Sequence, residues 1–169
     1  MRARYHAAFS MGTGFLGWAL SRSWGLTLGI MMGGVIIDLD HLVDYIVHYG
    51  WRLDIRRFFR ASYCGEYERA LLFLHAWELW LLVGCAALIF PRQWLAGLAL
   101  GWGLHLLLDQ VMNRPVPGAY SLIYRWKRRF RYEVLFPLQA RMRYSASGGA
   151  SGSPPAGEKP ASSNADRIR

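Results

Sequence analysis

The sequence has only two cysteines, and it lacks the glycine-rich turn between a strand and a helix that forms a phosphate-binding loop. Cys85 lies within an apolar run and Cys64 within a basic loop, so no disulfide framework is expected. Acidic residues are also few, with 11 Asp and Glu against 20 Lys and Arg. The basic residues lie between and after the apolar runs instead of forming one stripe. This distribution argues against nucleic acid as the partner and for anionic lipid headgroups.

Hydrophobic residues, in contrast, make up 53% of the 169 positions, and eight positions are Trp. Four apolar runs are expected to cross a membrane as two helical hairpins. These runs are residues 7–20, 24–43, 70–90 and 94–112. The first run also has features of a signal peptide, but the second follows after only a short turn, which favours a first membrane helix. The expected fold is all-α, an integral membrane four-helix bundle over residues 1–113.

Glycines recur at every fourth position in two of the runs. Gly25, Gly29 and Gly33 lie in the second run, and Gly97 and Gly101 lie in the fourth. Small residues at this spacing let helix backbones approach closely in lipid. We therefore interpret these glycines as packing residues.

The remaining segments are expected to lie at the membrane surface or outside the membrane. Residues 45–69 contain five Arg and are predicted to include a short amphipathic helix around 51–59 that lies on the membrane. Residues 114–144 mix aromatic and basic residues and are predicted to be a juxtamembrane segment that binds anionic lipid, with RNA as the alternative partner. Residues 145–169 are rich in Ser, Gly, Pro and Ala and are expected to be disordered.

The ionisable residues of the four runs gather at one end of the expected bundle. They are His6, Asp38, Asp40, His41, His75, Glu78, His105 and Asp109. A rise of about 1.5 Å per residue brings all of them into the same half of the bilayer. Taken singly, a membrane His could instead bond to a neighbouring helix, Glu78 could pair with Arg69, and Asp109 could cap the end of the fourth helix. A shared centre is the interpretation that explains their common depth.

For most of these residues, the helix face on which they lie supports the same interpretation as their common depth. Three pairs share a helix face because their members are three or four residues apart. The pairs are Asp38 with His41, His75 with Glu78, and His105 with Asp109. Asp40 is about 200° from Asp38 on a regular helix, so it reaches the same centre only if the helix ends or distorts at Leu39. Asp44 and His48 are predicted to be surface groups.

Imidazole and carboxylate ligands suit zinc, and also manganese or iron. The predicted metal ligands are His6, Asp38, Asp40, His41, His75, His105 and Asp109. Glu78 and Asp40 are the candidates for moving a proton during catalysis. Arg125 and Asn113 are the candidate substrate-binding residues, although a membrane anchor explains the basic residues around Arg125 equally well.

At these positions the chain resembles the YdjM-like membrane-bound, metal-dependent hydrolases of bacteria. The motifs that carry the resemblance are His6, the Asp-x-Asp-His at 38–41 and the His-x-x-x-Asp at 105–109. The resemblance covers about residues 5–113, with Ile37 where the family usually has Pro and no second His near His75. It implies a four-helix inner-membrane protein distantly similar to zinc-dependent phospholipase C-type enzymes. It also implies hydrolysis of an ester or phosphoester, a lipid being one candidate, at the cytoplasmic interface.

The alternative is a non-catalytic membrane protein with a structural metal site or an ion or proton pathway. A pathway predicts polar groups in the outer half of the bilayer as well, and the four runs show almost none there. The hydrolase interpretation is therefore favoured.

Reporter fusions test the expected topology. Positive residues collect in the cytoplasmic loops of membrane proteins, and here they are concentrated in 45–69 and 125–143. Fusions after Arg60 and after Tyr144 should therefore read cytoplasmic, with both termini on that side, and a fusion within 91–93 should read external. A cytoplasmic reading within 91–93 would contradict the common depth of the ionisable residues.

Overall fold

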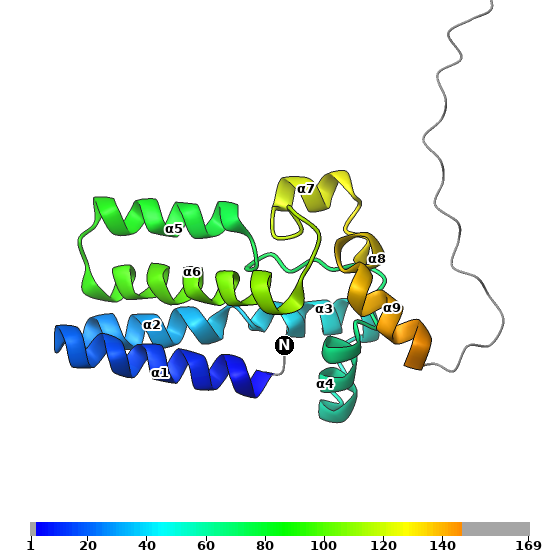
Figure 1. The fold of residues 1–169 in the computed structure, drawn as a ribbon, viewed down its shortest axis with the longest axis horizontal. Helices are drawn as coiled ribbons and strands as arrows, with labels where there is room; N and C mark the ends of the chain where they lie inside the picture. Colours follow the sequence, from blue (N-terminus) through cyan, green and yellow to red (C-terminus); the bar gives the residue numbers. More distant parts are fainter. Residues whose placement is uncertain (1–2, 147–169) are drawn as a thin grey trace, which may run out of the picture.

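The computed structural model describes residues 3–146, which form an all-helical chain (Figure 1). In order, the helices are α1 (Ala3–Ser21), α2 (Trp24–Ile36), α3 (Leu39–Tyr49), α4 (Ile55–Cys64), α5 (Trp77–Ile89), α6 (Gln93–Asn113), α7 (Leu122–Lys127), α8 (Tyr132–Leu135) and α9 (Pro137–Ala146). Residues 3–146 contain no β-strand, only an isolated bridge between Arg69 and Arg131. The all-α prediction is confirmed. Most of the tail predicted to be disordered, from residue 147 onward, lies outside the described residues.

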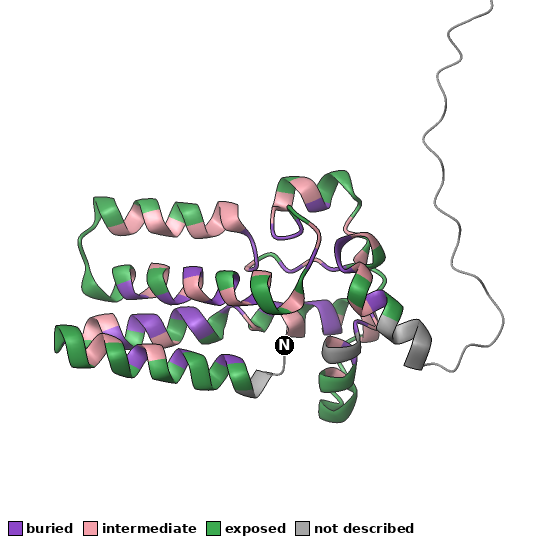
Figure 2. Cartoon of the chain, in the orientation of Figure 1, coloured by how far each residue is buried: buried purple, intermediate pink, exposed green. Residues whose placement is uncertain are grey.

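Four helices, α1, α2, α5 and α6, run side by side, with α3 beyond the end of α2 and α4 running across their direction (Figure 1). Helix α2 packs against both α1 and α6, and α5 packs on α6. Two stretches are long and apolar enough to cross a membrane: Trp24–Tyr49, which is α2 with α3, and Gln93–Asn113, which is α6. The outer surface of the four helices is largely exposed (Figure 2) and carries large apolar side chains such as Phe15, Leu82 and Leu88.

The regularly spaced glycines bring α2 and α6 into backbone contact. A Cβ atom on Gly33 would meet the carbonyl of Leu98 and lie 2.8 Å from the backbone nitrogen of Trp102. A Cβ atom on Gly101 would overlap the backbone carbonyl of Ile30. A larger residue at either position would force the helices apart, so the structure bears out the packing role inferred from the glycine spacing.

The second apolar run is not one continuous helix. Helix α2 ends at Ile36, a turn occupies Ile37 and Asp38, and α3 begins at the next residue. The turn brings both Asp38 and Asp40 within 4.0 Å of the imidazole nitrogens of His75. It is the distortion that the sequence requires if the two carboxylates are to meet a common neighbour.

The prediction of a continuous helix over residues 70–90 was wrong. Residues 70–76 form a loop, and α5 covers only Trp77–Ile89. Two carboxylates on α3 accept hydrogen bonds from the backbone of this loop and replace the bonds that a helix would have made. Tertiary contacts therefore override the apolar pattern, which taken alone favours a helix.

Residues 114–144 fold back onto the same loop and pack against it through a small hydrophobic core. The buried members of this core are Ala70, Leu72, Ala119, Tyr120, Leu135 and Phe136. The start of α5 is also tied to this segment, because the backbone N–H of Trp77 donates to the carbonyl of Tyr120 over 2.9 Å. The segment expected beside the membrane is thus part of the packed structure that positions the loop.

Two glycine variants test the contact between α2 and α6. Gly101→Ala should destabilise the protein by about 1–3 kcal/mol, the usual cost of overpacking a well-fitted contact. Gly84→Ala is the matched control, because nothing lies within 4 Å of the Cβ position on Gly84, and Ala in a helix interior stabilises it by about 0.5–1 kcal/mol relative to Gly. Thermal unfolding in detergent measures both variants. Equal stability of the two would contradict the close approach.

Candidate metal centre

The ionisable residues predicted to share a centre meet where α2 passes into α3. Six of them form two groups in which one ligand atom per residue lies within 4.8 Å of the others. The first group is His6 on α1 with His105 and Asp109 on α6, and the second is Asp38 in the turn after α2 with His41 on α3 and His75 in the loop before α5. Five segments of the chain therefore supply ligands to one small volume.

Two carboxylates lie at the middle of this cluster. Asp109 Oδ1 lies 3.2 Å from His6 Nε2, while its Oδ2 lies 3.3 Å from His75 Nε2 and 3.6 Å from His105 Nε2. Asp38 Oδ1 is 3.5 Å from His105 Nε2 and 4.0 Å from His75 Nε2. His75 and His105 thus each direct Nε2 toward both carboxylates.

The Nδ1 atoms of His75 and His105 each lie beside an oxygen that can only accept a hydrogen bond. His105 Nδ1 lies 2.8 Å from the carbonyl oxygen of Gly34, and His75 Nδ1 lies 3.2 Å from Asp40 Oδ2. A carbonyl or carboxylate oxygen only accepts, so each Nδ1 carries a proton, and in a neutral ring the lone pair is then on Nε2. Both Nε2 atoms are buried and have no hydrogen-bond partner.

These bare nitrogens and the negative oxygens of Asp38 and Asp109 face one another in a largely buried site. Such an arrangement is repulsive unless a positive charge is present, either as a second proton on an imidazole or as a metal ion between the groups. An imidazole whose other nitrogen donates to a carboxylate or a carbonyl is also the usual form of a metal-ligating His. The residues can therefore hold a divalent metal ion.

The cluster is open on one side. The side chains of Asp38 and His41 are each 31% exposed, whereas the other four ligands are buried. His6 stacks on His105 with 4.4 Å between ring centroids, which closes the side that faces α1. Asp38 and His41 are therefore the members of the cluster that solvent can reach.

Two carboxylates on α3 hold the loop that carries His75. Asp40 Oδ2 accepts from the backbone N–H of His75 over 3.0 Å as well as from its ring, and Asp40 belongs to neither ligand group. Asp44 Oδ1 accepts from the backbone N–H of Leu71 over 3.1 Å. The prediction that Asp44 is a surface group was wrong, because α3 turns it toward the loop and leaves it 1% exposed. His48 remains partly exposed.

Glu78, a predicted catalytic residue, is bound to the beginning of α7. Its carboxylate accepts from the hydroxyl of Ser121 and, over 3.1 Å, from the backbone N–H of Leu122. Glu78 belongs to neither ligand group. The structure thus joins Glu78 to the C-terminal segment and does not bring it together with the six ligands.

Arg125, a predicted substrate-binding residue, is fully buried and binds the backbone of the loop. Its Nη1 donates to the carbonyls of Leu71 and Leu72 over 2.7 and 2.6 Å, and its Nη2 donates to the carbonyl of His75 over 3.1 Å. Burial lowers the pKa of Arg125, while nearby carboxylates oppose that effect, and the group stays charged. Sequence reasoning missed this role because Arg125 stands in a run of basic residues of similar composition.

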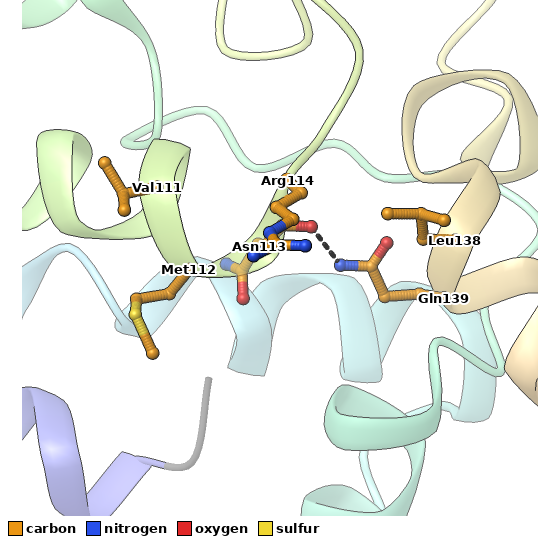
Figure 3. A pocket seen from close by; sticks show the side chains of 6 residues that line it. All are labelled: Val111, Met112, Asn113, Arg114, Leu138 and Gln139. Carbon is orange, nitrogen blue, oxygen red and sulfur yellow. Dashed lines mark hydrogen bonds between the residues drawn. The ribbon is translucent and has the colours of Figure 1, made fainter.

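Asn113, the other predicted substrate-binding residue, joins the cluster to a surface hollow. Its Nδ2 donates to Asp109 Oδ1 over 2.9 Å and to the hydroxyl of Tyr120 over 3.2 Å. Burial raises the pKa of Tyr120 well above its ordinary value, so the phenol stays protonated. Sequence reasoning missed Tyr120, which stands among many aromatic residues. The hollow has a volume of about 450 Å³ and is lined by Val111, Met112, Asn113, Arg114, Leu138 and Gln139 (Figure 3).

Comparison of the chain with protein-family models, with curated proteins and with solved structures finds no match. The interpretation of the cluster therefore rests on its own geometry.

The role of Arg125 can be tested through metal affinity. Arg125→Lys should weaken zinc binding about 10- to 100-fold, the usual effect of losing a group that orients a metal ligand. A lysine ammonium cannot span three separate carbonyls as a guanidinium does, so His75 loses its support. Arg128→Lys is the matched control, because Arg128 is exposed and lies over the ring of Tyr124. Competition with a chromogenic chelator measures the affinities. If both variants bind zinc as tightly as the unchanged protein, the loop does not depend on Arg125.

Proposed function

We propose that this protein is a membrane-bound, metal-dependent hydrolase that cleaves an ester or phosphoester at the cytoplasmic membrane interface. The observation that carries the proposal is the convergence of His75 Nε2 and His105 Nε2 on Asp38 and Asp109, both nitrogens being buried and without a hydrogen-bond partner. Zinc suits this donor set, with manganese or iron as alternatives. The two ligand groups can hold one ion each.

A divalent ion in this site supplies a Lewis acid and lowers the pKa of a bound water. The protein's own contribution is to fix the ligands and to leave one side open. Asp40 and Gly34 set the tautomers of His75 and His105, and Asn113 holds Asp109. Asp38 is the cluster carboxylate that water can reach, so it is the group that we assign to accept a proton from an attacking water.

The substrate class follows from the surroundings of the cluster. The hollow beside Asn113 combines apolar Val111, Met112 and Leu138 with the cationic Arg114 (Figure 3). Arg114 is exposed and makes no hydrogen bond or ion pair with the described residues 3–146. An amphiphile with an apolar chain and an anionic group matches this lining better than a sugar or a peptide does.

Membrane insertion is proposed for all four helices of the bundle. Trp24–Tyr49 and Gln93–Asn113 support it by length and composition. Helix α5 is shorter but carries exposed Leu82 and Leu88 on its outer face. The proposed membership in the YdjM-like hydrolases depends on five members of the cluster and on Asp40, which holds the loop that carries His75. A structural metal site without catalysis is the competing function.

Ligand variants test the metal and the chemistry together. His105→Ala and Asp38→Ala each remove one donor from a different ligand group, so each should lower the bound zinc per chain and abolish hydrolysis of chromogenic phosphoesters and lipid esters. His48→Ala is the control, because His48 belongs to neither group. Elemental analysis gives the zinc content, and thermal unfolding shows whether the fold survives.

Three outcomes decide between the functions. Empty, folded and inactive ligand variants support the hydrolase. Variants that lose both zinc and stability, in a protein that hydrolyses none of these esters, support a structural ion. Full zinc content in His105→Ala would contradict the proposed centre.

A further inference from the structure

We infer that residues 51–60 form a docking surface for an anionic phospholipid bilayer, with α4 lying in the plane of the headgroups. The segment begins with an irregular stretch and continues into α4. The carboxylate of Asp54 caps this helix by accepting from the backbone N–H of Arg57 over 3.1 Å, and Gly65 ends it in the left-handed conformation with φ 64°. Both ends of α4 are therefore set by local interactions, which lets the helix stand out from the rest of the fold.

Large apolar side chains are exposed together along this segment. Trp51 is 88% exposed, Ile55 64% and Phe59 54%, and Leu53 between them is also exposed. Ile55 and Phe59 are four residues apart, so they share one face of α4. Contiguous apolar groups of this size on a surface mark a site that contacts a membrane or a partner.

Arginines accompany the apolar face. Arg56, Arg57 and Arg60 line a surface hollow of about 320 Å³ together with Asp54. Arg57 lies over the ring of Tyr49, 4.0 Å from its centroid, and Arg60 lies 3.4 Å from a carboxylate oxygen of Glu66. Arg56 makes no ion pair with any of the described residues 3–146. A cationic hollow beside exposed aromatic and aliphatic groups is complementary to an anionic headgroup above its acyl chains.

The direction of α4 is consistent with docking on a bilayer surface. Helix α4 runs across the direction of α1, α2, α5 and α6 (Figure 1). If these four helices cross the bilayer, α4 lies along its surface, at the end of the bundle that also holds the metal cluster. The inference therefore rests on the proposed membrane location, but it does not depend on the metal or on catalysis.

A spin label on α4 tests the docking in the full-length protein. Both native cysteines are replaced by Ser, and Ile55→Cys or, as a reference on α5, Leu88→Cys carries the label. The protein is placed in nanodiscs of phosphatidylcholine with or without phosphatidylglycerol. Collision of the label with oxygen, which partitions into lipid, is compared with collision with a water-soluble nickel chelate. The label at residue 55 should read lipid in the anionic discs and move toward water in phosphatidylcholine alone.

The contribution of the Arg56 charge to docking is measured by adding Arg56→Gln to the labelled protein. Arg92→Gln, at the opposite end of the bundle, is the matched control. Arg56→Gln should lower the ratio of docked to undocked label about fivefold in anionic discs, the effect expected for one basic residue at such a surface. Arg92→Gln should leave the ratio unchanged, because Arg92 lies in the turn between α5 and α6.

The reference label separates failure of this inference from failure of the membrane location. A label at residue 55 that reads water in anionic discs, while the label at residue 88 reads lipid, overturns the docking surface and leaves the bundle in the membrane. Water readings at both positions overturn the membrane location as well. A label at residue 55 that neither reagent reaches, with broadening by a second spin, shows a second copy of the chain on this face and also overturns the inference.

Discussion

One end of this molecule depends on the contacts between buried imidazole nitrogens and carboxylate oxygens. His75 and His105 each have one nitrogen committed to an acceptor, so the other is left bare beside carboxylate oxygens. Without a positive charge these groups repel one another where little water can screen them. Helices α1, α3 and α6, a turn and a loop supply these groups, and a bound divalent ion would hold the five segments together.

The loop at 70–76 is the element through which the rest of the chain acts on that site. Its N–H groups are held by the carboxylates of Asp40 and Asp44, and its carbonyls are held by Arg125. The backbone polar groups of the loop are thus satisfied by buried and partly buried side chains, which fixes its position without a regular helix. Residues 114–144 consequently contribute to the geometry of the centre, although neither ligand group includes any of them.

The sequence predicted the cluster because ionisable side chains are rare in apolar runs and their depth along a helix follows from residue number alone. The ligands on α1 and α6 could be predicted from this depth alone. The position of Asp40 was harder to predict, since it depends on the turn between α2 and α3. The loop at 70–76 and the roles of Asp44 and Arg125 could not be predicted, because they depend on which side chain meets which backbone group after the helices have packed. Hydrophobic periodicity contains no information about such contacts between side chains and the backbone.

The glycine contact between α2 and α6 has a consequence for ion size. Gly33 and Gly101 bring the backbones of α2 and α6 into close contact, so the two helices cannot move nearer to each other. The turn with Asp38 follows one of these helices directly, and His105 and Asp109 lie on the other. The separation between the donor atoms of these residues therefore depends on the contact between the backbones of α2 and α6. Zinc bonds to nitrogen and oxygen at about 2.0–2.2 Å and calcium to oxygen at about 2.3–2.6 Å. Donor atoms held at a short separation would favour the smaller ion, in addition to the preference of the donors themselves.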